Sequence, residues 1–176
     1  TEGKHCSVCG EVLTVQEEVP ATGIHNYEDG KCTICGAADP DAVKLFDLSG
    51  TFMVLGNSLQ VNFAVDTAKL TGTDNYAVIV KEYADGTTKT ETIPQSEWLK
   101  YSGTVYYFSF NGVAAKEMTD ELTVVVYNAE GAQVTNTKVD SIEDYCVRML
   151  RKSTKAKEQT VFVDMLNYGA AAQKYF

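Results

Sequence analysis

Apolar and polar residues alternate along much of the chain after Val43. Between residues 58 and 65, every second residue is apolar: Leu59, Val61, Phe63 and Val65. A period of two predicts a strand with one buried face. The same pattern over 105–110 predicts a second strand with Tyr106, Phe108 and Phe110 on one face.

Turn signals divide the rest of this region into further strands. Asp85-Gly86 separates 76–83 from 87–93 and predicts a tight hairpin, whose threonine-rich second strand suits a solvated edge. Residues 94–99 break the pattern and predict a single helical turn. The nearly continuous apolar run 122–127 predicts a central strand, and 132–139 its partner.

The period changes near residue 141. Ile142, Tyr145, Cys146, Met149 and Leu150 form the stripe of an amphipathic helix, with Ser141 and Asp144 placed as a capping box. After a polar link, the pattern predicts a last helix. One broad face of it would carry Val161, Phe162, Met165, Leu166, Gly169, Ala172 and Phe176. The two helices predict a helical hairpin over about 141–176.

We therefore expect a mainly β protein with α-helices, in two parts. Residues 1–39 form a small zinc-ribbon-like module, and the linker around Asp39-Pro40 ends it. Residues 40–176 form a β-sandwich-like domain of roughly six to eight strands, capped by the C-terminal helical hairpin.

Cysteines add the candidate chemistry. Cys6 and Cys9 share the CxxCG spacing of Cys32 and Cys35, and 22 residues separate the two pairs. Such turns direct sulfur atoms to one point, and four thiolates complete a tetrahedral zinc site. We expect one structural zinc ion, which replaces the core that so short a module lacks. Two alternatives stay open: a histidine in place of one thiolate, and disulfides.

Both histidines lie near these cysteines. His5 adjoins Cys6, which favours a position at the surface or beside the ligands. His25 lies seven residues before Cys32. It is expected to pack against Tyr27 or to donate a hydrogen bond to a thiolate, and metal ligation is its alternative role.

Charge limits the partners. The chain has 24 acidic and 15 basic residues, a net charge of −9, which argues against nucleic acid and anionic membrane surfaces. No apolar run approaches the roughly 20 residues that span a bilayer. No signal segment opens the chain, and we expect a mature or excised piece of a longer precursor.

No catalytic constellation emerges, and we expect a protein that is not an enzyme. A nucleophilic triad would need a histidine after residue 25, and there is none. Cys146 lies on an apolar helical stripe and is expected to be a buried, inert thiol. A hydrolase built on two facing carboxylates remains a weaker hypothesis, which requires a cleft holding both groups.

Aromatic residues offer one further hypothesis. Trp98, Tyr101, Tyr106 and Tyr107 cluster near a strand start, and exposed rings on β-sandwiches stack on sugars. Trp98, Tyr101 and Tyr107 are the candidates for ligand stacking. The simpler interpretation is that these rings fill the core or cover its edge.

Several segments resemble those of a known group of proteins. Residues 25–40 resemble a cysteine-knuckle repeat of large secreted or wall-associated proteins of gut Firmicutes. Residues 113–121, 141–145 and 165–176, the last ending in LNYGAAAQKYF, resemble an uncharacterised module in the same proteins. The resemblance implies an extracellular, surface-displayed piece of a multidomain protein and no activity.

Together these observations predict a non-enzymatic extracellular binding or spacer module of a Gram-positive surface protein, monomeric within a larger chain. Its ligand would be a protein, the cell wall or a glycan. The alternative is a carbohydrate-binding module that serves a catalytic domain outside this chain.

Overall fold

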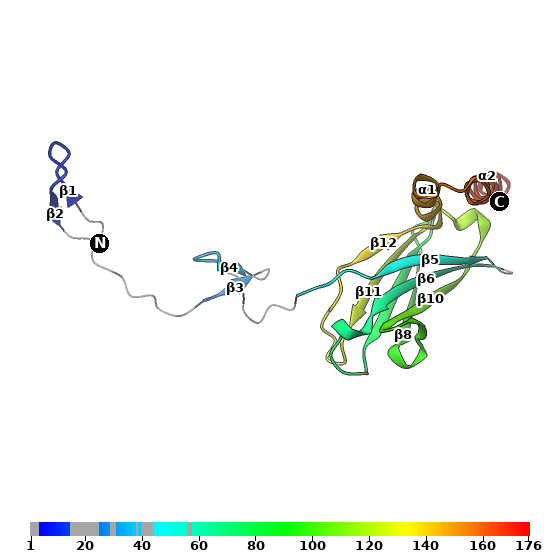
Figure 1. The fold of residues 1–176 in the computed structure, drawn as a ribbon, viewed down its shortest axis with the longest axis horizontal. Coiled ribbons are helices and arrows are strands. Elements are labelled where there is room, and N and C mark those ends of the chain that lie inside the picture. The colour runs from blue at the N-terminus through cyan, green and yellow to red at the C-terminus, as the bar shows by residue number, and fades with distance from the viewer. Residues whose placement is uncertain (1–3, 15–24, 29–30, 38, 40–43, 56–57) are drawn as a thin grey trace. The chain divides into compact units, whose positions relative to one another are not determined.

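The computed structural model describes residues 4–14, 25–28, 31–37, 39, 44–55 and 58–176 (Figure 1). The chain divides into two compact units, Thr1–Ala42 and Val43–Phe176. The first unit contains two small antiparallel hairpins. In one, β1 (Lys4–His5) pairs with β2 (Val12–Thr14), and in the other β3 (Tyr27–Glu28) pairs with β4 (Lys31–Cys32).

Two antiparallel sheets make up most of the second unit (Figure 1). The first sheet has the order β5-β6-β10-β9, which are Gly50–Leu55, Leu59–Asp66, Val105–Val113 and Leu99–Ser102. The second has the order β12-β11-β7-β8, which are Lys138–Asp140, Glu121–Tyr127, Tyr76–Glu82 and Thr88–Pro94. Three short 3-10 helices join strands: η1 (Thr67–Lys69), η2 (Gln95–Glu97) and η3 (Ala115–Glu117).

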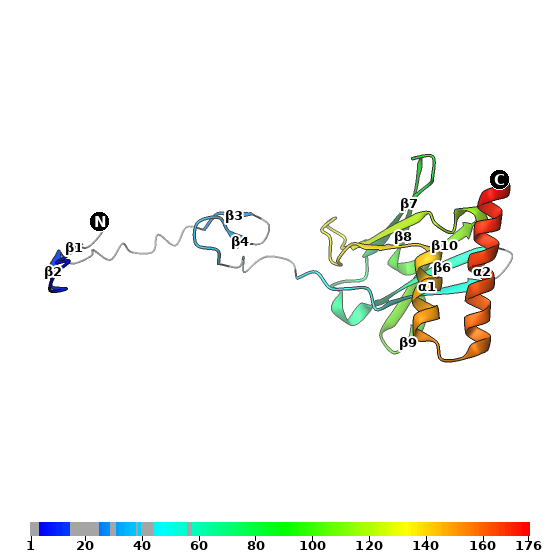
Figure 2. The ribbon, with the colours of Figure 1, turned by 90° about the horizontal axis from the view of Figure 1, so that it is seen from above.

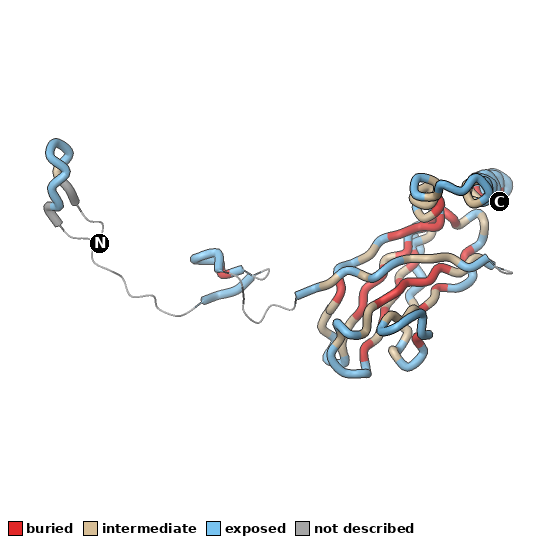
Figure 3. Tube along the Cα trace, in the orientation of Figure 1, coloured by how far each residue is buried: buried red, intermediate tan, exposed pale blue. Residues whose placement is uncertain are grey.

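The core lies between the two sheets. Both contribute alternate residues to it, among them Val61, Phe63 and Phe108 from the first and Ile79 and Val124 from the second. Figure 3 shows this as buried segments that recur along the strands of both sheets. Burial follows the period of two in β7, whereas residues 61–65 of β6 are all buried.

Two helices follow β12 directly. Ser141 caps α1 (Ile142–Lys152), because its hydroxyl accepts the Asp144 N–H at 3.0 Å. The second helix, α2 (Ala156–Tyr175), returns antiparallel beside it (Figure 2). Ile142 and Cys146 enter the core, and Met165 of α2 packs against it. A mainly β unit with two C-terminal helices is thus confirmed.

The structure corrects three details. Residues 132–139 form a continuous strand only over β12, and Thr135 and Gln133 make isolated bridges. Val161 and Phe176, expected on the buried face of α2, are 45% and 88% exposed. Phe176 follows the last turn of α2, and Val161 lies on the outer side of the helix. Phe162, Met165 and Leu166 make the contacts with the core instead.

Candidate metal centre

The two cysteine pairs have the same local geometry. In the first, Gly10 donates its N–H to the carbonyl of Cys6 at 2.9 Å, and Cys6 donates to the Glu11 carbonyl at 2.7 Å. In the second, Gly36 donates to Cys32 at 2.9 Å, and Cys32 donates to the Ala37 carbonyl at 2.7 Å.

Glycine allows the backbone conformation that each of these turns requires. Gly10 and Gly36 have φ angles of 77° and 72°, a left-handed conformation that side chains with a Cβ adopt rarely. The glycine after each CxxC is therefore explained by backbone geometry. All five cysteines lie within the described residues and are free thiols.

His25 brings a third ligand to the second pair. Its Nδ1 lies 3.4 Å from the Sγ of Cys32 and 3.4 Å from the Sγ of Cys35. The three ligand atoms lie within 4.8 Å of one another and could hold a metal ion. The His25 ring also stacks on Tyr27, with 5.7 Å between centroids.

These distances fit coordination. With zinc–nitrogen bonds of about 2.0 Å and zinc–sulfur bonds of about 2.3 Å, a tetrahedron separates the ligand atoms by about 3.5 Å. The same distances also fit a hydrogen-bonding role, in which the Nδ1–H of His25 is shared between the two thiolates. The structure thus places His25 at the site, and both roles expected for it are compatible with its position.

Backbone amides favour the thiolates. The N–H groups of Cys35 and Ile34, followed by His25, lower the pKa of Cys32 to about 6. The N–H groups of Cys9 and Val8 likewise lower the pKa of Cys6. Because the thiolate is the form that binds metal, the lowered pKa values of Cys6 and Cys32 favour metal binding by each CxxC turn.

Convergence of the two pairs on one ion stays a prediction. The segment 15–24 that joins the hairpins lies outside the described residues, as does the side chain of His5.

The aromatic candidates divide into two groups. Trp98 is 5% exposed, its indole lies 5.3 Å from Phe108, and its Nε1 donates to the Ile93 carbonyl at 3.1 Å. Trp98 is therefore a core residue, in agreement with the simpler interpretation, and its burial argues against ligand stacking. Tyr101 is 63% exposed and Tyr107 is half-buried, and both contact Phe52, which sequence reasoning missed.

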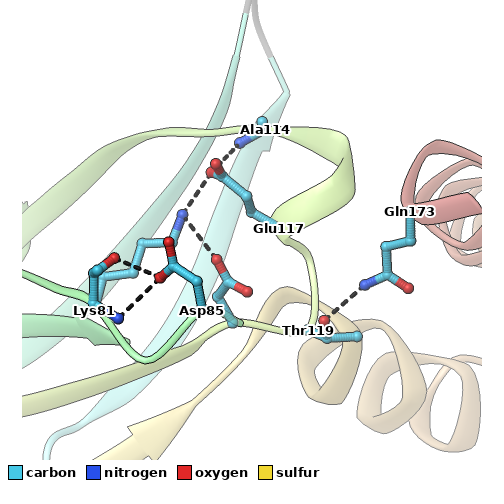
Figure 4. Close-up of polar contacts among 8 residues, drawn as sticks. Lys81, Asp85, Ala114, Glu117, Thr119 and Gln173 are labelled. Carbon is cyan, nitrogen blue, oxygen red and sulfur yellow. Dashed lines mark hydrogen bonds and ion pairs between the residues drawn. The ribbon is translucent and has the colours of Figure 1, made fainter. Parts of the chain in front are cut away.

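A cleft of about 590 Å³ in the second unit lies beside a buried ion cluster. Lys81 is 1% exposed, and its Nζ lies 2.6 Å from Glu117 and 3.3 Å from Asp120 (Figure 4). The ammonium also lies 4.2 Å from the centre of the Tyr83 ring. Gln173 of α2 donates to Thr119 at the rim.

This cluster bears on the two-carboxylate hypothesis, because the cleft is lined by three carboxylates, those of Asp85, Glu117 and Asp120. Burial opposes ionisation of Glu117, but hydrogen bonds from Lys81 and the Ala114 N–H outweigh it and lower its pKa. A general acid needs the opposite shift. The arrangement is that of a structural ion pair.

Comparison with protein-family models, with characterised proteins and with solved structures finds no match. Neither helix in the described part of the chain has the length and apolar character that a bilayer span requires.

Proposed function

We propose that the chain is a non-enzymatic binding or spacer module of a bacterial surface protein, displayed outside a Gram-positive cell. Its first unit is a zinc-ribbon-like module held by one structural zinc ion, and its second is a β-sandwich-like domain with a helical cap. The observation that supports the zinc site is the matched geometry of two CxxCG turns, with His25 against the sulfurs of the second. The proposed surface display rests on the sequence resemblance.

Cys6, Cys9, Cys32 and Cys35 are the proposed zinc ligands. Their turns are alike, and backbone amides lower the pKa of the first thiol in each pair. His25 then supports the sulfurs through Nδ1. In the alternative set, His25 replaces one thiolate. Either set fills all four positions and leaves none for water or substrate, which favours a structural role over catalysis.

Metal analysis tests the site directly. Protein purified without added metal is expected to contain one zinc ion per chain and no disulfide. Chelation should release the zinc and unfold the first unit, because so small a unit has little core of its own. Backbone NMR signals of residues 4–14 and 25–37 report that unfolding.

A matched pair of variants gives the control. Cys35→Ser should lose the zinc, whereas Cys146→Ser, which changes the one cysteine outside both turns, should keep it. Metal-free protein with Cys6, Cys9, Cys32 and Cys35 joined in disulfides would overturn the proposal.

Cobalt substitution separates the two ligand sets. Four thiolates should give strong sulfur-to-cobalt charge transfer that persists in His25→Ala, with roughly 10- to 100-fold weaker metal affinity. If His25 is a ligand, the same variant should change the ligand-field bands and free a coordination position.

A further inference from the structure

The face of the first sheet that points away from the core is partly open to solvent and carries aromatic side chains. Residues opposite one another in antiparallel strands share a face. Ala64, Tyr107 and Leu99 form one such row, and Asn62 with Ser109 and Phe52 forms the next. Leu99 and Tyr101 are 56% and 63% exposed, whereas Asn62 and Ala64 are 0% and 6% exposed, so water reaches this face at β9 and not at its centre.

Three aromatic rings meet at one end of the face. Phe52 of β5 lies 5.3 Å from Tyr101 of β9 and 5.2 Å from Tyr107 of β10, measured between ring centroids. The faces of aromatic rings carry negative potential and attract the polarised C–H groups of an apolar or sugar surface. A solvated sheet face normally carries polar residues, and Tyr101 departs from this because its ring is 63% exposed.

Amide and hydroxyl groups lie beside the rings. Gln60 donates to Asn62 at 2.7 Å and to Ser109 at 2.9 Å, and Ser109 donates to Asn62 at 2.7 Å. The Asn62 Nδ2 is fully buried and has no hydrogen-bond partner. Because this atom is closed to solvent, Ser109, which is only partly buried, is the polar group of this network that a ligand can contact.

A groove of about 450 Å³ continues from these residues. It is lined by Tyr107, Ser109 and Asn111 from β10 and by the carboxylates of Glu91 and Glu97. Lys89 pairs with Glu91 at 2.7 Å, whereas Glu97 is exposed and has no ion pair within the described residues. No cationic side chain lines the groove.

We infer that this face binds a neutral glycan chain. Tyr101 and Tyr107 stack on sugar rings, and Asn111, Ser109 and Glu97 exchange hydrogen bonds with hydroxyl groups. Tyr107 belongs to both the aromatic cluster and the groove, so one extended ligand can contact the two together. The inference rests on the proposed function as a binding module and names its ligand class.

The groove's chemistry favours this ligand over others. Lys89 offsets the charge of Glu91, and the carboxylate of Glu97 repels polyanionic glycans and nucleic acid, in line with the net charge of −9. Carboxylates and amides match the hydroxyl pairs of sugars, and open aromatic rings match their C–H faces. An extended peptide along the free edge of β10 beyond Tyr107 is the competing occupant.

Affinity electrophoresis of the full chain tests the inference. The probes are mixed-linkage β-glucan, xylan and mannan, with polygalacturonate as the polyanion. At least one neutral polysaccharide is expected to retard the protein, and polygalacturonate is not. Tyr101→Ala should weaken that binding roughly five- to tenfold, because it removes an exposed ring. Asn111→Ala should weaken it as well.

Tyr175→Ala is the matched control, since Tyr175 is 86% exposed on α2 and lies outside the groove. Migration unaffected by all three neutral polysaccharides, or equal loss in Tyr101→Ala and Tyr175→Ala, would refute the inference. So would binding of an extended peptide that competes at this face in place of a glycan.

The same experiment after chelation separates the two proposals. Zinc stoichiometry and glycan retardation are independent readouts. A protein that holds zinc without binding glycan refutes only the inference, and one that binds glycan without zinc refutes only the structural metal.

Discussion

At the scale of single residues, Lys81 is the least expected member of the core. It continues the inward-facing series of Ala77 and Ile79 on β7, at the end where the strand approaches η3. Its ammonium is held by Glu117 and Asp120 and covered by Tyr83. The alternating pattern predicts that position 81 faces inward, but only the fold reveals the two carboxylates, which lie about forty residues away in sequence.

Replacing this lysine should change how stability depends on pH. The ordinary pKa of a glutamate is 4.5, and that of Glu117 is lowered in the folded protein. The ionised carboxylate therefore stabilises the fold at pH values above 4.5, and this stability is lost as the pH falls through the lowered pKa. Lys81→Met should lower the free energy of unfolding by about 2 kcal/mol at pH 7, because it leaves buried carboxylates unpaired.

Acidification of Lys81→Met should recover part of that loss, since protonation neutralises the unpaired carboxylates. Urea denaturation at pH 7 and pH 4 measures both effects. Lys89→Met removes an exposed pair and should change stability by less than about 0.5 kcal/mol. Parallel pH curves for the native protein and Lys81→Met would contradict the assignment.

Cys146 should differ from the other four thiols in reactivity. It is fully buried in α1, and burial, with Glu143 second, raises its pKa to about 11. Below that pH the thiol stays neutral and unreactive. Alkylation of the chelated protein at pH 8, read by peptide mass spectrometry, should modify the cysteines of both CxxCG turns and spare Cys146 until urea is added. Labelling of all five at one rate would be inconsistent with the fold.

At the scale of elements, α2 docks through its glycine. A Cβ at Gly169 would lie 2.7 Å from the Met118 sulfur and 3.5 Å from the Ala115 carbonyl oxygen. Gly169→Val should therefore lower the free energy of unfolding by about 2 kcal/mol through overpacking. Ala171→Val, at an exposed position of the same helix, is the control. Denaturation followed by Trp98 fluorescence measures both variants, and equal stability would show that α2 is not tightly docked.

Sequence patterns identify elements where burial has a simple period. The strands β6, β7 and β10 and the N-terminus of α1 at Ser141 are confirmed. The side chains of β7 alternate in burial as expected, whereas β6 is buried throughout residues 61–65. The single turn expected over 94–99 is present as η2. By contrast, β5 and β9 were not predicted, because β9 is exposed throughout and β5 lies at a sheet edge with no buried residue.

Surface sites are harder to predict, because separate strands build them. The cysteine turns are visible in sequence, since spacing and the following glycine determine them locally. The aromatic cluster is different. Phe52 joins Tyr101 and Tyr107 only through the order β5-β6-β10-β9. Trp98 is adjacent to them in sequence but points into the core beside Phe108.

At the scale of the whole molecule, the order of the strands has a consequence for synthesis. The strands β5 and β6 belong to the first sheet, and β7 and β8 to the second. The next pair, β9 and β10, joins the first sheet again, and β11 and β12 join the second. β6 meets its inner neighbour only when β10 exists, and β7 only when β11 exists. A nascent chain therefore cannot complete either sheet early, and pairing between distant strands slows folding further. Under the surface display that we propose, this delay would keep the polypeptide unfolded for passage through a narrow export channel.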